Sequence, residues 1–206
     1  MKIIVATANP GKYNEIREIL DNGQNTLKSA AEVGFTEFPE ETGNTFLENA
    51  YIKAKAVYDG LKGTLSPPFV VISDDSGLSV DELDGRPGVY SARFAGPNAK
   101  SDENIDKLLK EMQDIPEGKR QAAFICSVVG LTYREERFYA QGRLSGVITR
   151  ERIGDSGFGY DPVFYLPAKG KTLAQMTSEE KNAISHRGKA LKKLYIILRN
   201  CYREND

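Results

Sequence analysis

Apolar residues in this 206-residue chain fall into short runs and helical stripes, which alternate along its first part. Short runs at Lys2–Thr7, Thr26–Val33 and Phe69–Ser73 predict strands, of which the first and third are apolar enough to be buried. Between them, apolar positions spaced three and four residues apart predict a helix after the turn Asn9-Pro10-Gly11. A second and longer helix is predicted over 46–60, because Thr45 and Glu48 form a capping box at its start.

The middle of the chain is richer in strands than its beginning. Gln121–Tyr133 and Arg137–Arg143 predict a long hairpin, and Leu144–Thr149 predicts a further strand. Leu78–Val80 either extends the strand before it or pairs with that strand. Helical spacing returns at 105–112 and 191–198. We expect one domain, residues 1–206, of the α/β class, in which helices flank a mixed sheet and the middle stretch makes a second lobe.

Composition excludes several functional classes. The 28 Lys and Arg residues balance 29 Asp and Glu residues, so the chain lacks the basic excess of a non-specific nucleic-acid binder. One histidine and two cysteines come close to excluding a zinc site and rule out a disulfide framework, which favours a reducing, cytoplasmic location. The sequence has no apolar run near the roughly 20 residues of a membrane span, and its N-terminal apolar run is too short for a signal peptide.

The turn between the first predicted strand and helix has the features of an anion site. Backbone N–H groups point outward together at such a turn and at the helix N-terminus that follows it. Lys12 adds a mobile positive charge. An ordinary tight turn with a solvated lysine is the alternative. The candidate residues are Thr7, Ala8, Asn9, Pro10, Gly11 and Lys12.

A pair of carboxylates, Asp74 and Asp75, ends the third predicted strand. Adjacent carboxylates repel each other, so a divalent cation is a natural companion, and Mg²⁺ prefers one or two carboxylates together with waters and phosphates. Because successive strand residues point to opposite faces, only one aspartate needs to face the site. The acidic pair Glu40 and Glu41 is a candidate source of a further ligand, although such a pair alone is more often solvated surface. The segment 73–77 is also a plausible plain turn.

Two later segments carry side chains suited to a flat ligand. In Gly157–Pro162, glycines flank Phe158. Their lack of side chains lets the backbone approach a flat ligand, on which the Phe158 ring could stack; a hairpin turn around a core phenylalanine is the alternative. In Ser185–Gly188, the only histidine, His186, stands beside Arg187, and both can donate hydrogen bonds to a keto oxygen or phosphate, although a lone histidine is more often structural.

Three lysines complete the picture. One of them, Lys53, stands four residues after Asn49, so the two share a face of the helix predicted over 46–60. Lys12, Lys53 and Lys181, together with the acidic cluster, describe a magnesium–polyphosphate site, and Phe158 with the Ser-His-Arg group describes a place for a heterocycle. The combination predicts an enzyme acting on nucleoside triphosphates. A non-catalytic nucleotide sensor is the alternative from another class, but it gives no reason for keeping both the acidic cluster and the cations.

These segments, in this order, resemble the inosine/xanthosine triphosphate pyrophosphatases, which remove non-canonical purine nucleotides. The matching blocks run over nearly the whole chain: Thr7–Lys12, Glu41–Gly43 with Phe46 and Glu48–Ala50, Ser73–Leu78, Pro87–Arg93, Gly157–Pro162, and Glu180-Lys181 through Ser185–Gly188. A pyrophosphatase for modified pyrimidines or methylated guanine is a second possibility, against which the Ser-His-Arg-Gly block argues.

The resemblance implies an elongated mixed sheet with two lobes, an active-site cleft between them, and a homodimer. It also implies Mg²⁺-dependent hydrolysis of dITP, ITP and XTP to the monophosphate and pyrophosphate. Asp75 would be the catalytic base, and Glu41 and Asp75 would bind the metal. Donors from Arg187 or His186 would suit the 6-oxygen of hypoxanthine. The implied substrate-binding residues are Thr7, Ala8, Asn9, Pro10, Gly11, Lys12, Lys53, Ser76, Phe158, Gly159, Tyr160, Asp161, Lys181, His186 and Arg187.

Overall fold

The chain divides into two compact units in a computed structural model that describes residues 1–21 and 23–203. The first unit comprises Met1–Asp75, Cys126–Gly142 and the residues from Arg187 onward. The second comprises Ser76–Ile125 and Arg143–His186. Within the described ranges, no helix is both long and apolar enough to cross a membrane.

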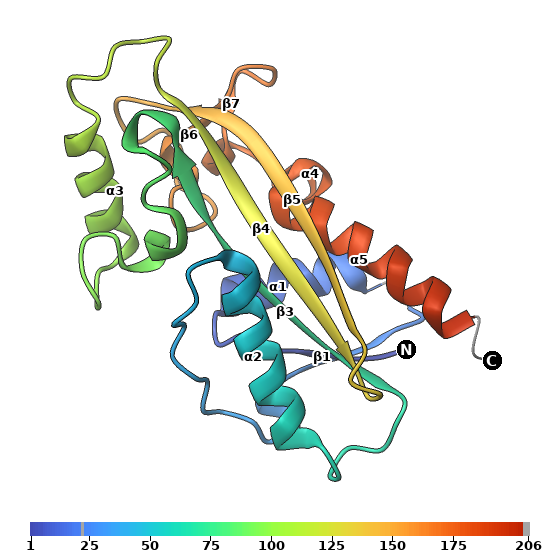
Figure 1. The fold of residues 1–206 in the computed structure, drawn as a ribbon. Helices are drawn as coiled ribbons and strands as arrows, with labels where there is room; N and C mark the ends of the chain where they lie inside the picture. Colours follow the sequence, from blue (N-terminus) through green and yellow to red (C-terminus); the bar gives the residue numbers. More distant parts are fainter. Residues whose placement is uncertain (22, 204–206) are drawn as a thin grey trace. The chain divides into compact units, whose positions relative to one another are not determined.

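Seven strands form a mixed sheet in the order β2-β1-β3-β4-β5-β6-β7 (Figure 1). β1 pairs with β2 and β3 in parallel, whereas β6 pairs with β5 and β7 antiparallel. β4 and β5 are neighbours joined by the four residues 133–136, as in a hairpin. The strands are β1 Lys2–Val5, β2 Thr26–Ser29, β3 Phe69–Val80, β4 Gln121–Thr132, β5 Arg137–Ile148, β6 Phe164–Leu166 and β7 Lys171–Thr172.

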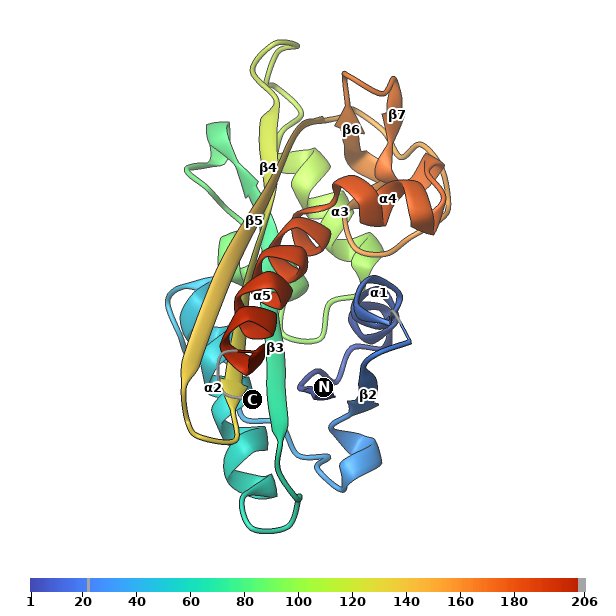
Figure 2. The ribbon, with the colours of Figure 1, turned by 90° about the vertical axis from the view of Figure 1, so that its right-hand side faces the viewer.

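In the first unit, helices cover both faces of the strands. Residues of β1 alternate between two cores, since Ile3 and Val5 join one and Ile4 joins the other. The first core is closed by α1 (Pro10–Leu20) and α5 (His186–Arg203), and the second by α2 (Phe46–Leu61). Figures 1 and 2 show α2 and α5 on opposite sides of the strands. Side chains on the two faces of one strand therefore meet different helices.

The second unit has one core, which includes Leu78, Phe124 and Phe164 from the strands. Against them pack Ile105 and Leu108 of α3 (Ser101–Glu111) and, in part, Ile184 of α4 (Ser178–Ile184). Short 3-10 turns lie between longer elements within each unit. They span Ala31–Val33 in the first unit and Asp81–Leu83, Gly88–Arg93, Asp161–Val163 and Leu173–Gln175 in the second.

The predicted mixed α/β sheet with flanking helices is confirmed, and three strand boundaries were wrong. The strand predicted over Thr26–Val33 ends at Ser29, because Ala31–Val33 form a 3-10 turn closed by Gly34 at φ 88°. Leu144–Thr149 continues β5 and is no separate strand. The strand predicted over Phe69–Ser73 runs on unbroken through Asp74 and Asp75 to Val80, so of the two alternatives for Leu78–Val80 the extension is confirmed. The single domain and the cleft between lobes stay predictions.

Candidate functional site

The turn after β1 is built by a helix cap. The side chain of Asn9 accepts a hydrogen bond from the backbone N–H of Lys12 at 3.1 Å, and Pro10 stands at the first helical position of α1. The hydroxyl of Thr7 accepts one from the N–H of Asn9 at 3.2 Å. These hydrogen bonds hold the backbone of residues 7–12 at the start of α1. From there the Lys12 side chain reaches the carboxylates of β3.

The two aspartates of β3 lie in the middle of the strand and not at its end, which corrects the sequence prediction. Strand alternation then separates them. Asp74 shares its face with Val70 and Ile72, which belong to the core closed by α1 and α5. Asp75 shares its face with Val71, which belongs to the core closed by α2. Adjacent carboxylates therefore meet different partners.

Asp75 is contacted from α2. The side-chain amide of Asn49 donates to Asp75 Oδ2 at 3.1 Å, and Lys53 Nζ lies 3.8 Å from Asp75 Oδ1. The same lysine pairs with Glu41, and the amide oxygen of Asn49 accepts from the N–H of Gly43 at 2.8 Å. One helix thus ties the turn around Glu41 to Asp75, and the predicted common face of Asn49 and Lys53 is confirmed.

Asp74 is fully buried and belongs to a different network. Its Oδ2 accepts from Arg187 Nε at 3.1 Å and lies 3.4 Å from Lys12 Nζ. Arg187 also pairs with Glu15 of α1, and the thiol of Cys126 lies 3.8 Å from the same aspartate oxygen. Asp74 therefore serves to organise charges inside the unit.

These surroundings move the two carboxyl pKa values in opposite directions. Burial raises the pKa of Asp75, and the neighbouring Lys53 and Lys12 only partly offset that effect. Burial also favours protonation of Asp74, but Lys12, Arg187 and Lys53 together outweigh it and hold its pKa well below the usual range. Such a split gives one carboxylate that stays ionised and a second one with a raised proton affinity, as acid–base chemistry requires.

The carboxylates beside Lys53 fit a divalent cation of the magnesium type. Glu41 and Asp75 approach the same ammonium group, so both can face one ion. Asp74, on the other face of β3, keeps an unused acceptor of its own, because its buried Oδ1 has no hydrogen-bond partner among the described residues. The described residues hold no group of three or more His, Cys, Asp or Glu side chains suited to a metal, but Mg²⁺ takes one or two carboxylates and completes its shell with water and phosphate.

In the second unit, the loop before Asp161 presents Phe158, whose side chain is 37% exposed. The carboxylate of Asp161 accepts a hydrogen bond from the N–H of Phe158 at 3.0 Å. Gly157 adopts φ 80°, and a Cβ there would lie 2.2 Å from Asp161 Oδ2. The sequence prediction explained this glycine by the approach of a ligand. The structure explains it by the internal carboxylate that shapes the loop.

Lys181 of α4 makes its described contacts in this same loop. Its ammonium group donates to Asp161 Oδ2 at 2.7 Å and stands 4.5 Å from the centre of the Phe158 ring. Both partners of the ion pair are nearly buried. Lys181 therefore supports the aromatic side chain, whereas the sequence prediction had it neutralise a triphosphate, and that role stays a prediction.

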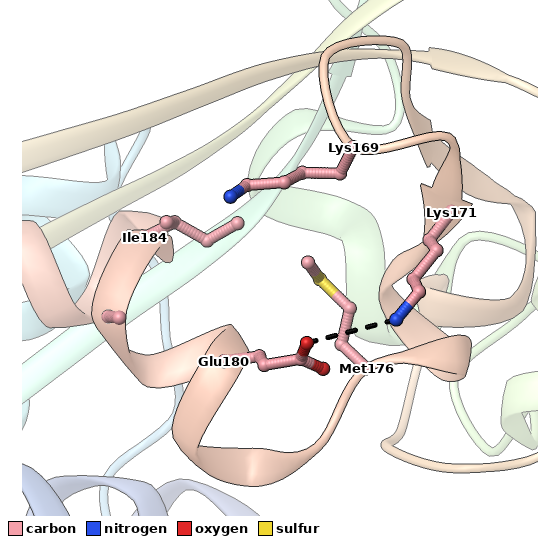
Figure 3. A pocket seen from close by; sticks show the side chains of 6 residues that line it. Lys169, Lys171, Met176, Glu180 and Ile184 are labelled. Atoms are coloured by element: carbon pink, nitrogen blue, oxygen red, sulfur yellow. Dashed lines mark ion pairs between the residues drawn. The ribbon is translucent and has the colours of Figure 1, made fainter.

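The capping box of α4 explains how Lys181 reaches this position. Thr177 accepts from the N–H of Glu180, and Glu180 accepts from the N–H of Thr177. Glu180 also lies 3.7 Å from Lys171 at the rim of a pocket of about 290 Å³, lined by Lys169, Lys171, Met176, Glu180, Ala183 and Ile184 (Figure 3). With Glu180 held on that side, the next residue points inward to Asp161.

The remaining predicted residues divide between the two units. His186 stacks on Phe124, with ring centres 4.8 Å apart and planes at 11°, and the Tyr160 hydroxyl donates to the carbonyl of Ser91 at 2.8 Å. Gly159 lies between Phe158 and Tyr160 at φ 60°. Ser76 follows Asp75 in β3 and is half-buried. Arg187 follows His186, yet its described partners are carboxylates, so a place at the edge of a base stays a prediction.

Sequence reasoning missed two residues of the first unit, Asn49 as a partner of Asp75 and Glu15 as a partner of Arg187. Asn49 lies in the matching block at Glu48–Ala50, and helical spacing had placed it beside Lys53, so a signal for it existed. Glu15 stands three residues after Lys12 on α1, a spacing that puts both on one helix face. Nothing local distinguished Glu15 from the exposed Glu18.

These features define an α/β protein with an open mixed sheet. Paired carboxylates lie among lysines in its first unit, and a loop of its second unit carries an aromatic side chain. The model of the Ham1 family matches residues 3–196, and the chain belongs to that family. The resemblance found in the sequence is thereby confirmed.

Relatives match over nearly their whole length. The chain is 49% identical to the dITP/XTP pyrophosphatase of Bacillus subtilis (strain 168) over 195 residues, which cover 95% of this chain and 96% of the relative. It is 46% identical to the dITP/XTP pyrophosphatase of Escherichia coli (strain K12) over 201 residues, 97% of this chain and 98% of that one. The structure of the Staphylococcus aureus Ham1 protein matches with a TM-score of 0.83 and 38% identity, over 97% of this chain and 99% of that one.

Proposed function

We propose that this protein hydrolyses non-canonical purine nucleoside triphosphates, namely dITP, ITP and XTP, to the monophosphate and pyrophosphate. The observation that carries the proposal is the pair of β3 carboxylates on opposite faces of the strand, beside Lys12 and Lys53, in a chain of the Ham1 family. The names of its relatives supply the substrate class. The enzyme thereby removes these nucleotides from the nucleotide pool.

The first unit supplies the chemistry at the phosphates. Lys12 and Lys53, with the backbone of turn 7–12, offset the negative charge that repels an incoming nucleophile. Asp75, with its raised pKa, accepts the proton of a water molecule, whose oxygen forms a new bond to the α-phosphorus while the bond to the pyrophosphate oxygen breaks. Mg²⁺ held by Glu41 and Asp75 would polarise phosphate oxygens and stabilise the leaving pyrophosphate.

The second unit supplies the place for the purine. Phe158 offers an exposed ring for stacking, and its loop is fixed by Asp161 and Lys181. His186, a nearly buried donor, suits the 6-oxygen that hypoxanthine and xanthine share. Adenine presents an amine at this position, which leaves a buried donor unpaired at a cost of about 1–3 kcal/mol. The order of preference should therefore be ITP before ATP.

The product pattern tests the assignment. Incubated with ITP and Mg²⁺, the protein should release pyrophosphate and IMP. Pyrophosphate and orthophosphate are measured separately, in a preparation free of inorganic pyrophosphatase, over ITP, XTP, dITP, GTP, ATP and dTTP. Orthophosphate with IDP as the first products would exclude the proposal, and tight ITP binding without turnover would indicate the nucleotide sensor.

The free energy of unfolding tests the surroundings of Asp75, first without the metal and then with it. In the metal-free protein, Asp75→Asn should raise the free energy of unfolding at pH 7 but not near pH 3. The raised pKa of Asp75 means that the protonated form suits the folded state; that contribution is complete below the unfolded pKa of about 3.9 and is lost as pH rises through the folded pKa. Urea unfolding of both proteins across this pH range gives the difference.

Adding Mg²⁺ completes the stability experiment. The wild type should gain stability at pH 7, because a ligand of the folded state stabilises it, and Asp75→Asn should gain much less. Equal gains in both proteins would remove Asp75 from the metal ligands. A stability difference between the two metal-free proteins that does not change with pH would contradict the raised pKa.

Assembly and location complete the proposal. We propose a homodimer, which the family resemblance implies, and a cytoplasmic location, which the cysteine usage favours. Cys126 and Cys201, both inside the described part of the chain, form no disulfide, and a reducing compartment preserves thiols. Sedimentation analysis of the purified protein tests the dimer.

A further inference from the structure

Three aromatic rings contact one another in sequence inside the second unit. The imidazole of His186 lies nearly parallel to the ring of Phe124, with ring centres 4.8 Å apart and planes at 11°. The Phe124 ring also lies 4.7 Å from that of Phe164, with planes at 47°. All three side chains are buried, and centre-to-centre separations of this size are those that aromatic pairs prefer. One face of the imidazole is therefore covered by a phenyl ring.

The backbone of β5 fixes the other end of this row of rings. Phe164, the first residue of β6, pairs with Ile148 of β5, and its ring passes over Gly146 of the same strand. A Cβ at Gly146 would lie 2.6 Å from Phe164 Cε1, so the missing side chain lets the ring rest against the strand backbone. Phe124 thus contacts a ring that the sheet holds in place, and through Phe124 the sheet sets the plane of His186.

The plane of an imidazole decides where its hydrogen bonds point. The two ring nitrogens of a histidine hold their donor and acceptor sites in the plane of the ring. A hydrogen bond weakens steeply when its angle falls toward about 120°. A tilt of the His186 ring would therefore weaken a hydrogen bond to a fixed acceptor even if the side chain kept its place.

We propose that Phe124 is a positioning residue for base recognition, which holds the plane of His186 so that a ring N–H meets the 6-oxygen of hypoxanthine or xanthine. The inference rests on the proposed function for the role of His186. Phe124 acts through the imidazole and does not touch the substrate. Selectivity between ITP and ATP then depends on a phenylalanine of β4 that lies outside the blocks matched to the family in the sequence.

The kinetic test compares Phe124→Leu with the matched control Phe94→Leu. Both phenylalanines are 8% exposed and belong to the same core, but the described ring contact of Phe94 is Lys107. Phe124→Leu should lower the ITP to ATP ratio of kcat/KM by roughly 2- to 10-fold, the net effect of one misaligned hydrogen bond. Phe94→Leu should keep the wild-type ratio. A smaller folded fraction would lower both rates equally and leave the ratio unchanged.

Nuclear magnetic resonance tests the ring contact without any substrate. His186 is the only histidine of the chain, so protein freed of a purification tag gives one set of imidazole signals. Its carbon-bound ring protons should resonate upfield of their positions in the unfolded protein, because the Phe124 ring current shields them. The upfield shift should be largely lost in Phe124→Leu and kept in Phe94→Leu.

A double-mutant cycle tests the route through His186. His186→Ala should lower the ITP to ATP ratio on its own, and adding Phe124→Leu should change it less than two-fold further, since coupled residues are not additive. Additive effects, an unchanged ratio in His186→Ala, a Phe124→Leu protein that behaves like Phe94→Leu, or wild-type imidazole protons without an upfield shift would each overturn the inference. Absence of pyrophosphate release from ITP by the wild type would instead overturn the proposed function.

Discussion

Asp75→Asn is expected to lower kcat for ITP by about 10³-fold or more while the protein stays folded. A positioned general base alone contributes roughly 10²- to 10⁴-fold, and this substitution also removes a metal ligand. The amide keeps the size of the carboxylate and its contact with Asn49 on α2, so the fold has no reason to change. Steady-state rates of pyrophosphate release give the measurement.

Asp74→Asn is the matched control, one residue away in the same strand. It removes a charge from the buried pair with Arg187, and losing one partner of such a pair costs about 3–5 kcal/mol of stability. We therefore expect a large fall in unfolding free energy and a much smaller loss of kcat than in Asp75→Asn. Turnover that survives in Asp75→Asn and collapses in folded Asp74→Asn would place the chemistry on the Asp74 face of β3 and contradict the assignment of Asp75.

Lys181→Met is expected to cost about 3–5 kcal/mol of stability, because it leaves the Asp161 carboxylate buried without its cation. The same change withdraws support from the Phe158 ring. Stacking of a base on an aromatic side chain is worth about 1–3 kcal/mol, so displacement of the ring should raise KM for ITP roughly 5- to 150-fold. Denaturant unfolding and steady-state kinetics measure the two effects.

Lys171→Met makes the same substitution in an exposed pair. Lys171 and Glu180 lie 3.7 Å apart, with their side chains 46% and 48% exposed, so solvent screening should make the loss of stability much smaller than in Lys181→Met. Its KM for ITP should not change. Equal losses in the two variants would show that the Lys181–Asp161 pair contributes no more than a surface pair.

Much of the fold was predictable because local signals agreed with the final structure. The capping box at Thr45 and Glu48 starts α2, and the apolar positions after it face the core. The prediction failed where tertiary structure overrides local chemistry. Asp74 and Asp75 look like the end of a strand, but lysines and an arginine distant in sequence make two buried carboxylates tolerable in mid-strand.

The candidate site was predictable in its residue types but not in their partners. The motifs pointed to Lys12, the pair Asp74 and Asp75, and Phe158 as candidates, and the family resemblance, not the spacing, selected Asp75 from the pair. They could not show that Arg187 meets Glu15, because 172 residues separate the two and no spacing rule reaches that far. Lys181 was expected among phosphates for its charge and its place in a matching block, whereas its described contacts are an internal carboxylate and a ring.

The position of the carboxylates inside β3 also limits which length changes the gene can tolerate. Removing or adding one residue between Phe69 and Asp74 would exchange the faces of the two aspartates. Asp74, which now pairs with Arg187, would then face α2. Removing or adding two residues would keep each carboxylate on its own side and only displace it along the strand. Insertions in the connection at 62–67 leave the alternation unchanged, so length variation belongs there and not in the seven residues that follow Pro68.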